Sequence, residues 1–157
     1  MDNKRIPILN NLLSQIEENI PHKEQKKPSI SKTNVGWQLD HTLKVINGVC
    51  GIMIKTNPNK YKKDFNMIRT VLFPLCYIPR GKARAPKMVL PPDIILEEDL
   101  LNQLQKARNH ITKVKPLPQK SHFKHHVFGM LTKQQTLRFL EIHTKHHLKI
   151  VNDILKH

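Results

Sequence analysis

The stretch TLRFLEIHTKHHLKIVNDIL, residues 136–155, decides the fold class of this chain. It contains neither proline nor glycine, and its apolar residues recur at spacings of three and four, which is typical of one face of an α-helix. Thr132 can cap the start of this helix, which would reach His157. The face expected to point inward carries, in order, Thr136, Leu140, His143, His147, Ile150 and Ile154. The stretch therefore predicts a long packed helix with two histidines on its buried side.

The eleven prolines divide the rest of the chain into windows, because proline inside a helix removes a hydrogen bond and clashes with the preceding turn. Apolar periodicity within these windows predicts helices at about 8–20, 34–56, 61–75 and 97–115, with linkers at 21–32 and 78–92. No strand pattern, internal repeat or glycine-rich nucleotide loop is recognisable. We therefore predict an all-α four-helix bundle, in which the helix near 61–75 is accessory or part of a crossover.

The chain's 157 residues predict a single domain, 1–157, with its core at about 34–155. Lys and Arg number 27 against 12 Asp and Glu, and this net charge of +15 favours anionic partners: nucleic acid, membrane head groups or a small anionic ligand. The longest apolar stretches, 45–54 and 71–78, are shorter than the roughly 20 residues of a spanning helix. Residues 1–20 lack the pattern of a secretory signal. We expect a cytoplasmic protein without a membrane partner.

Two cysteines, Cys50 and Cys76, lie inside apolar helical patterns and fit no paired metal or redox motif. We interpret both as reduced thiols of the core. The sequence does not determine the oligomeric state, and a homodimer is compatible with it.

Three of the ten histidines lie on faces expected to be buried. His143 and His147 are one turn apart, so both rings can reach one ion at about 2.0 to 2.1 Å. His41 lies within the apolar surface of the 34–56 helix. An unsatisfied buried imidazole costs about 2 to 7 kcal/mol, and one divalent cation satisfies both His143 and His147, with His41 as a possible third ligand from another helix. We predict a metal site at His41, His143 and His147, against the alternative of a hydrogen-bonded cluster.

The other histidines are expected to have different roles. His146 lies about 100° off the inward stripe, which indicates a flanking position. The cluster His122, His125 and His126 precedes the last helix and is expected to be solvated, although it could line the mouth of a cavity. No Glu follows His143 as a general base would in a zincin motif, which excludes that class of metalloprotease.

Three segments occur in a fixed order: Val35-Gly-Trp-Gln-Leu-Asp-His41, His126-Val-Phe-Gly-Met-Leu-Thr132, and His143-Thr-Lys-His-His147. Together they resemble the DinB/YfiT-like metalloprotein superfamily, and more narrowly a bacterial branch classed as a domain of unknown function. The resemblance spans about 34–151 and implies an up-down-down-up bundle, a cavity at one end, and a divalent metal on His41, His143 and His147. Lys145 departs from it, because this branch often has Asp there.

Three neutral imidazoles leave open positions on zinc or nickel, which is the arrangement of catalytic sites. Relatives in the superfamily imply transfer of a low-molecular-weight thiol to an electrophile, or a hydrolase-type reaction, but no catalytic residue is assigned. Arg80, Lys82 and Arg84 are candidates to hold the carboxylates of an anionic thiol, unless they are simply solvated. The alternatives are a basic nucleic-acid-associated protein and a metal-free scaffold. The positive charge is scattered along the chain and only 5% of residues are aromatic, which disfavours a nucleic-acid site.

Overall fold

The computed structural model describes residues 4–81 and 84–156. Its α-helices are α1 (Arg5–Asn19), α2 (Val35–Lys55), α3 (Met67–Leu75), α4 (Glu97–Val114) and α5 (Lys133–Leu155). A hairpin of β1 (His122–His125) and β2 (Gly129–Thr132) precedes α5, and short 3-10 turns lie at η2 (Ile20–His22), η3 (Pro58–Lys60) and η4 (Lys87–Val89). The chain is therefore mostly helical, as its apolar periodicity predicts.

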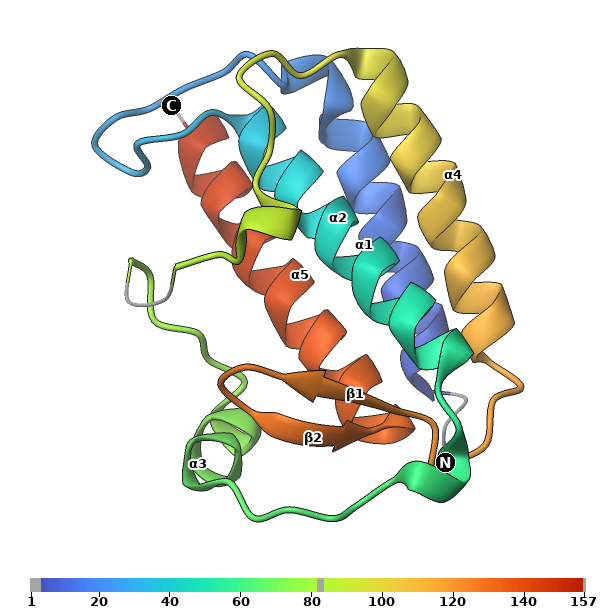
Figure 1. Cartoon of the computed structure of the whole chain (residues 1–157). Coiled ribbons are helices and arrows are strands. Elements are labelled where there is room, and N and C mark those ends of the chain that lie inside the picture. Colours follow the sequence, from blue (N-terminus) through green and yellow to red (C-terminus); the bar gives the residue numbers. More distant parts are fainter. Residues whose placement is uncertain (1–3, 82–83, 157) are drawn as a thin grey trace.

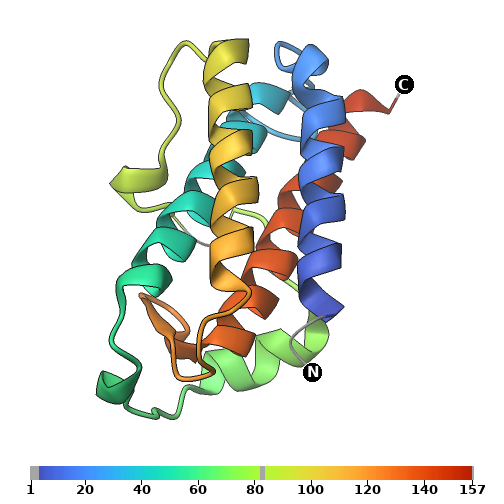
Figure 2. The ribbon, with the colours of Figure 1, turned by 90° about the vertical axis from the view of Figure 1, so that its right-hand side faces the viewer.

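Helices α1, α2, α4 and α5 form a bundle in which α2 contacts α4 and α5, and α1 contacts the same two helices. Figures 1 and 2 show that α1 and α5 run away from the end with the hairpin, whereas α2 and α4 run towards it. Because α2 and α4 are parallel neighbours, the chain between them must cross back along the bundle. This crossover, residues 56–96, contains α3 and η4.

The core lies between the four long helices and includes α1, so it begins before residue 34. Helix α1 starts at Arg5, earlier than expected, because Pro7 occupies the first turn, where no backbone N–H donor is needed. All four long helices contribute to the most deeply buried side chains, which include Leu9, Leu13, Ile16, Leu39, Leu43, Ile46, Leu100, Ile111 and Leu137. Helix α5 begins with a full capping box between Thr132 and Gln135, as the position of Thr132 predicts.

The absence of strands, expected from the sequence, is wrong for residues 122–132. The antiparallel hairpin pairs His122 with Thr132 and His125 with Gly129 around a three-residue loop. Gly129 has φ 70°, in the left-handed region that such loops require. Each strand has four residues, which is too short for an alternating pattern to stand out, so only the glycine could have indicated the turn.

Helix α3 begins at Met67 and not at residue 61. The side chain of Asn66 accepts a hydrogen bond from the Arg69 backbone N–H and starts the helix there. Upstream of it, Asp64 is tied to the hairpin, because its Oδ2 accepts from the Met130 N–H at 2.8 Å. Arg69 donates to Asp64 and to the carbonyls of Phe128 and Met130, at 2.7 to 3.0 Å. These polar bonds hold 61–66 extended and attach α3 to the hairpin.

The two cysteines differ. Cys50 is fully buried in α2, and this burial raises the pKa of its thiol to about 12. Cys76 is exposed and ends α3 with φ 50°, so the interpretation of Cys76 as a core thiol is wrong. Another face of α3 packs inward, and there the ring centroids of Phe73 and Phe128 lie 5.2 Å apart. Among the described residues, no helix combines the length and hydropathy needed to cross a bilayer.

Candidate metal centre

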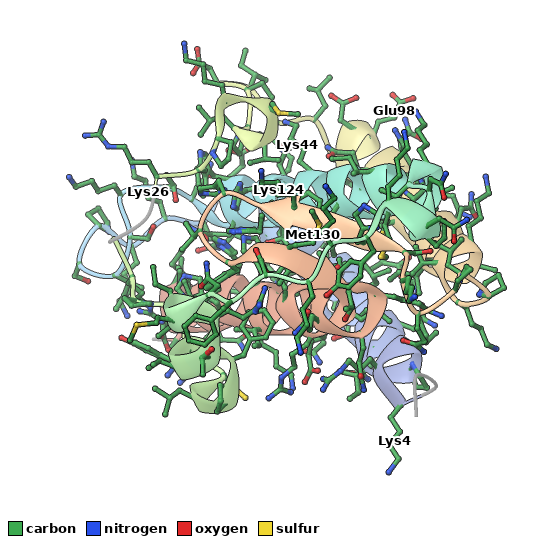
Figure 3. The ribbon with its side chains drawn as sticks, turned by 60° about the horizontal axis from the view of Figure 1, so that its bottom comes forward. Lys4, Lys26, Lys44, Glu98, Lys124 and Met130 are labelled. Carbon is green, nitrogen blue, oxygen red and sulfur yellow. The ribbon has the colours of Figure 1, made fainter. Side chains whose placement is uncertain are left out.

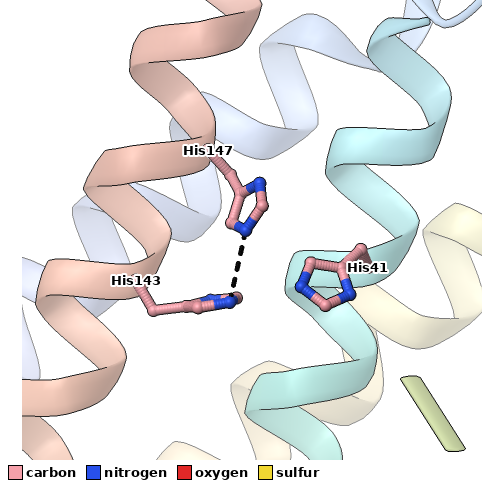
Figure 4. A group of neighbouring side chains, drawn as sticks. All are labelled: His41, His143 and His147. Atoms are coloured by element: carbon pink, nitrogen blue, oxygen red, sulfur yellow. Dashed lines mark hydrogen bonds between the residues drawn. The ribbon is translucent and has the colours of Figure 1, made fainter. Parts of the chain in front are cut away.

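The structure brings His41 of α2 together with His143 and His147 of α5, as the sequence predicts (Figure 4). The ring centroids of His41 lie 5.1 Å from His143 and 4.8 Å from His147, and those of the latter two are 4.5 Å apart. One ring nitrogen from each residue lies within 4.8 Å of the others. The three imidazoles therefore form a group that could hold a metal ion.

Two of the three rings are oriented by hydrogen bonds on the side away from the group. The Nδ1 of His41 lies 2.9 Å from the carbonyl oxygen of Val89 in η4, so it must donate there. The Nδ1 of His147 lies 2.6 Å from Oε1 of Gln38. Gln38 is fixed in turn, because its Nε2 donates to Thr33 Oγ1 at 2.8 Å. With their protons on Nδ1, both rings present the Nε2 lone pair to the group.

His143 has the least satisfied ring of the three. Its Nε2 lies 3.2 Å from the Nε2 of His147, and its Nδ1 is buried without a hydrogen-bond partner among the described residues. Two imidazole nitrogens bound to one tetrahedral ion at 2.0 to 2.1 Å would be about 3.3 Å apart. The observed separation therefore suits either an N–H···N bond or an ion shared by the two Nε2 atoms.

Burial sets the protonation state of the three rings. His41 and His143 are buried and His147 is partly buried. Desolvation lowers the pKa of His41, and it lowers the pKa values of His143 and His147 well below 6.5, helped by the neighbouring histidines. The rings are therefore neutral at pH 7, which is the form that binds transition metals.

Trp37 covers one side of the group. Its ring stacks on His41 with centroids 5.1 Å apart and planes at 21°. Trp37 also lines a cleft of about 510 Å³ at the start of α2, together with Lys26, Lys32 and Pro91. The cleft and the histidine group thus share Trp37 as a neighbour.

The remaining histidines stay outside the group. His146 meets the edge of His147 at 4.9 Å, the flanking position expected for it. The Nδ1 of His125 accepts the backbone N–H groups of Val127 and Phe128, so His125 stabilises the hairpin turn, and burial lowers its pKa to about 4. This role differs from the solvated one expected for it. His126 is exposed, and His122 bonds to the carbonyl of Lys120.

The cations proposed to hold a substrate carboxylate are only partly placed. Arg80 forms an ion pair with Asp153 at 2.7 Å, and Arg84 is exposed. Lys82 lies outside the described residues. Lys145 pairs with Glu141 at 2.7 Å, where the same buried carboxylate also meets Arg5. The ion pair of Lys145 is therefore made within α5, to Glu141 and not to an imidazole.

Sequence reasoning missed two contributors to the group, Gln38 and the Val89 carbonyl. Gln38 lies one turn before His41 on the same buried face, and a polar residue there was a usable signal. The Val89 contact had no signal, because a main-chain oxygen carries no residue identity. In comparisons with known proteins, the chain matches no family model, no curated protein and no solved structure.

Proposed function

We propose that this protein binds one divalent transition metal through His41, His143 and His147. The observation that carries this proposal is the pair of outward hydrogen bonds, from His41 to Val89 and from His147 to Gln38. They turn the Nε2 lone pairs of both rings towards the third ring, whose own Nε2 lies 3.2 Å from the Nε2 of His147. Metal-binding histidines in proteins typically donate their second N–H in this way.

We further propose that the chain is a DinB-like metalloprotein. The course of the bundle, with α1 and α5 opposed to α2 and α4, agrees with this assignment, as does the origin of the histidines from the second and last long helices. A ligand set of imidazoles alone favours zinc or nickel over magnesium or calcium, which prefer oxygen ligands.

The reaction we propose is transfer of a small anionic thiol to an electrophile, with metal-assisted hydrolysis as the variant. A bound zinc or nickel ion would lower the pKa of a coordinated thiol or water. The chain's own contribution is to keep three imidazoles neutral, to orient two of them, and to cover His41 with Trp37. Lys26 and Lys32 line the neighbouring cleft and could attract the carboxylates of such a thiol, a role for which Arg80 is less suited because of its pair with Asp153.

Elemental analysis of the protein purified without added metal tests the binding proposal. We expect close to one equivalent of a transition metal per chain, and loss of it in the His143→Ala/His147→Ala variant. The matched control is His122→Ala/His126→Ala, which removes two histidines outside the group. Thermal unfolding with and without a chelator provides a second reading, because a ligand that binds only the folded state raises the midpoint.

The two variants separate the possible results. Full metal content in the His143/His147 variant would place the metal elsewhere, and equal loss in the control would mean nonspecific binding by surface histidines. Either result contradicts the proposal. Transfer activity is assayed separately, by adding small thiols and an electrophile to metal-loaded protein, so that absence of turnover does not bear on binding.

A further inference from the structure

The hairpin end of the bundle gathers positive charge that is scattered along the sequence. The end of α2 with the segment that follows it, the end of α4 and the start of the hairpin meet there (Figure 1). The exposed lysines of these parts are Lys55, Lys60, Lys62, Lys63, Lys113, Lys115, Lys120 and Lys124. Within the part of the chain that the structure describes, none of these eight pairs with a carboxylate. Asp64, which lies in the same segment as Lys62 and Lys63, is already engaged by Arg69.

The same end exposes an apolar row on α3. One face of α3 packs on the hairpin through Arg69 and Phe73. The opposite face and its flanks leave large apolar side chains exposed: Phe65 80%, Met67 69%, Ile68 49%, Val71 54%, Leu75 63% and Tyr77 57%. Isolated exposed apolar residues are ordinary, but six within thirteen positions of one short segment mark an interaction surface.

The apolar row and the lysines belong to one end of the molecule. Figure 2 shows α3 lying across the end of the bundle beside the hairpin, and Figure 3 looks onto this end, with Lys124 and Met130 at its centre and α3 beside them. The chain of 61–66 joins the two features, because it carries Lys62 and Lys63 and leads directly into Phe65 and α3. We call the eight lysines and six apolar residues the hairpin-end surface.

We propose that the hairpin-end surface docks the protein on an anionic lipid bilayer, at the level of the head groups. Lysines attract lipid phosphates, and an amphipathic helix can lay its apolar row about 5 to 10 Å into the boundary of the acyl chains. No membrane partner is expected from the sequence, because its apolar stretches are too short to span a bilayer. A helix that lies along the head-group region needs no such length.

Charge and chemistry favour a bilayer over two other occupants. A second copy of the chain would bring eight lysines against eight lysines in a symmetric contact, and like charges oppose such an interface. A nucleic acid would use the lysines, but it is held by phosphate contacts and aromatic stacking and gives the aliphatic Met67, Ile68, Val71 and Leu75 no partner.

Cosedimentation of the full-length, metal-loaded protein with lipid vesicles tests the proposal. Vesicles containing phosphatidylserine at 30 mol% are compared with pure phosphatidylcholine vesicles at about 150 mM salt. We expect saturable binding to the anionic vesicles, weak binding to the neutral ones, and a decrease with rising salt because counterions screen exposed charges.

Two sets of variants locate the binding. Lys60→Ala/Lys62→Ala/Lys63→Ala should weaken the partition coefficient about a hundredfold, because each lysine near an anionic surface contributes about fivefold. The control Lys26→Ala/Lys32→Ala/Lys149→Ala removes the same charge from exposed positions away from the surface and should cost far less. Val71→Ser/Leu75→Ser keeps every charge and should weaken binding about tenfold or more through lost apolar burial.

Several outcomes overturn the proposal. Equal losses in the two lysine variants would mean that net charge alone drives the binding. The surface would be assigned to nucleic acid if the protein did not bind anionic vesicles but bound an oligonucleotide tightly, and if the Lys60/Lys62/Lys63 variant lost that binding. Dimers that Val71→Ser/Leu75→Ser dissociates would assign it to self-association. The substitutions in the hairpin-end surface replace no proposed metal ligand, so the metal content of those two variants should be unchanged and failure here is distinguishable from failure of the metal proposal.

Discussion

Replacing Gln38 by Leu should weaken metal binding without removing any proposed ligand. The Gln38 side chain is buried, and its Oε1 accepts the Nδ1 proton of His147 at 2.6 Å. Leu fills similar space and accepts nothing. In the metal-free variant the proton can move to Nε2 and bond to His143, but a bound ion occupies Nε2 and leaves Nδ1–H buried and unpaired. The penalty therefore falls on the metal-bound form.

The size of this effect follows from the cost of the unpaired group. A buried donor without an acceptor costs about 1 to 3 kcal/mol, which corresponds to a dissociation constant raised roughly 5- to 150-fold. Gln38→Glu keeps an acceptor at the same position and should restore most of the affinity. Both affinities are measurable by competition with a chromophoric zinc chelator at pH 7.5.

A matched control exists on the same helix. Asn47 Oδ1 lies 3.0 Å from Nδ1 of His110, an amide–imidazole pair of the same kind at a distance from the proposed ligands. Asn47→Leu removes that bond and should leave zinc affinity unchanged. If Gln38→Leu binds zinc within twofold of the unaltered protein, or if Asn47→Leu loses as much, the argument that Gln38 orients a ligand is refuted.

Three further predictions concern the whole fold. In the presence of a chelator, the free energy of unfolding should decrease as the pH is lowered from 6.5, by up to about 1.4 kcal/mol per pH unit for each proposed ligand. The reason is that burial lowers the pKa values of these histidines in the folded state, so that the unfolded chain binds more protons. A urea midpoint that stays constant from pH 8 to 5 would contradict this. Gly129→Ala should lower the free energy of unfolding in urea by about 2 to 4 kcal/mol, because the φ of Gly129 is 70° and the new methyl group would lie 2.3 Å from Asp64 Oδ2. The control is Gly48→Ala inside α2, where the methyl group meets nothing within 4 Å, and it should be neutral or slightly stabilising. Iodoacetamide should alkylate Cys76 alone in the native protein and Cys50 only after unfolding, as peptide mass spectrometry can verify; rapid native labelling of Cys50 would contradict its burial.

The parts of the fold that repeat regularly could be predicted from the sequence. The buried faces of the long helices are indicated by apolar residues at spacings of three and four. His143 and His147 lie on the same face as Leu140, because residues three or four positions apart are neighbours on a helix. His41 could be selected because Trp37 and Val45, which lie four residues before and after it, are apolar. Such patterns carry across whole elements, so an error of one or two residues at an end does not change them.

The parts that depend on single long-range contacts could not be predicted. Asp64 ends the expected helix early only because the Met130 N–H is there to bind it. The carbonyl of Val89 is 48 residues from His41 in the sequence. The apolar residues of 65–75 have helical spacing, but spacing does not tell whether the face meets the core or solvent.

The Val89 contact also has an evolutionary consequence. Because the acceptor for His41 is a main-chain oxygen, almost any amino acid at position 89 can supply it, provided that the backbone follows the same path. Inserting or deleting residues on either side of η4 would move that oxygen away even if every histidine were retained. Relatives of this chain should therefore tolerate amino-acid substitutions in the segment between α3 and α4 far better than insertions or deletions. A constant number of residues in that segment would indicate that the imidazole cluster is kept.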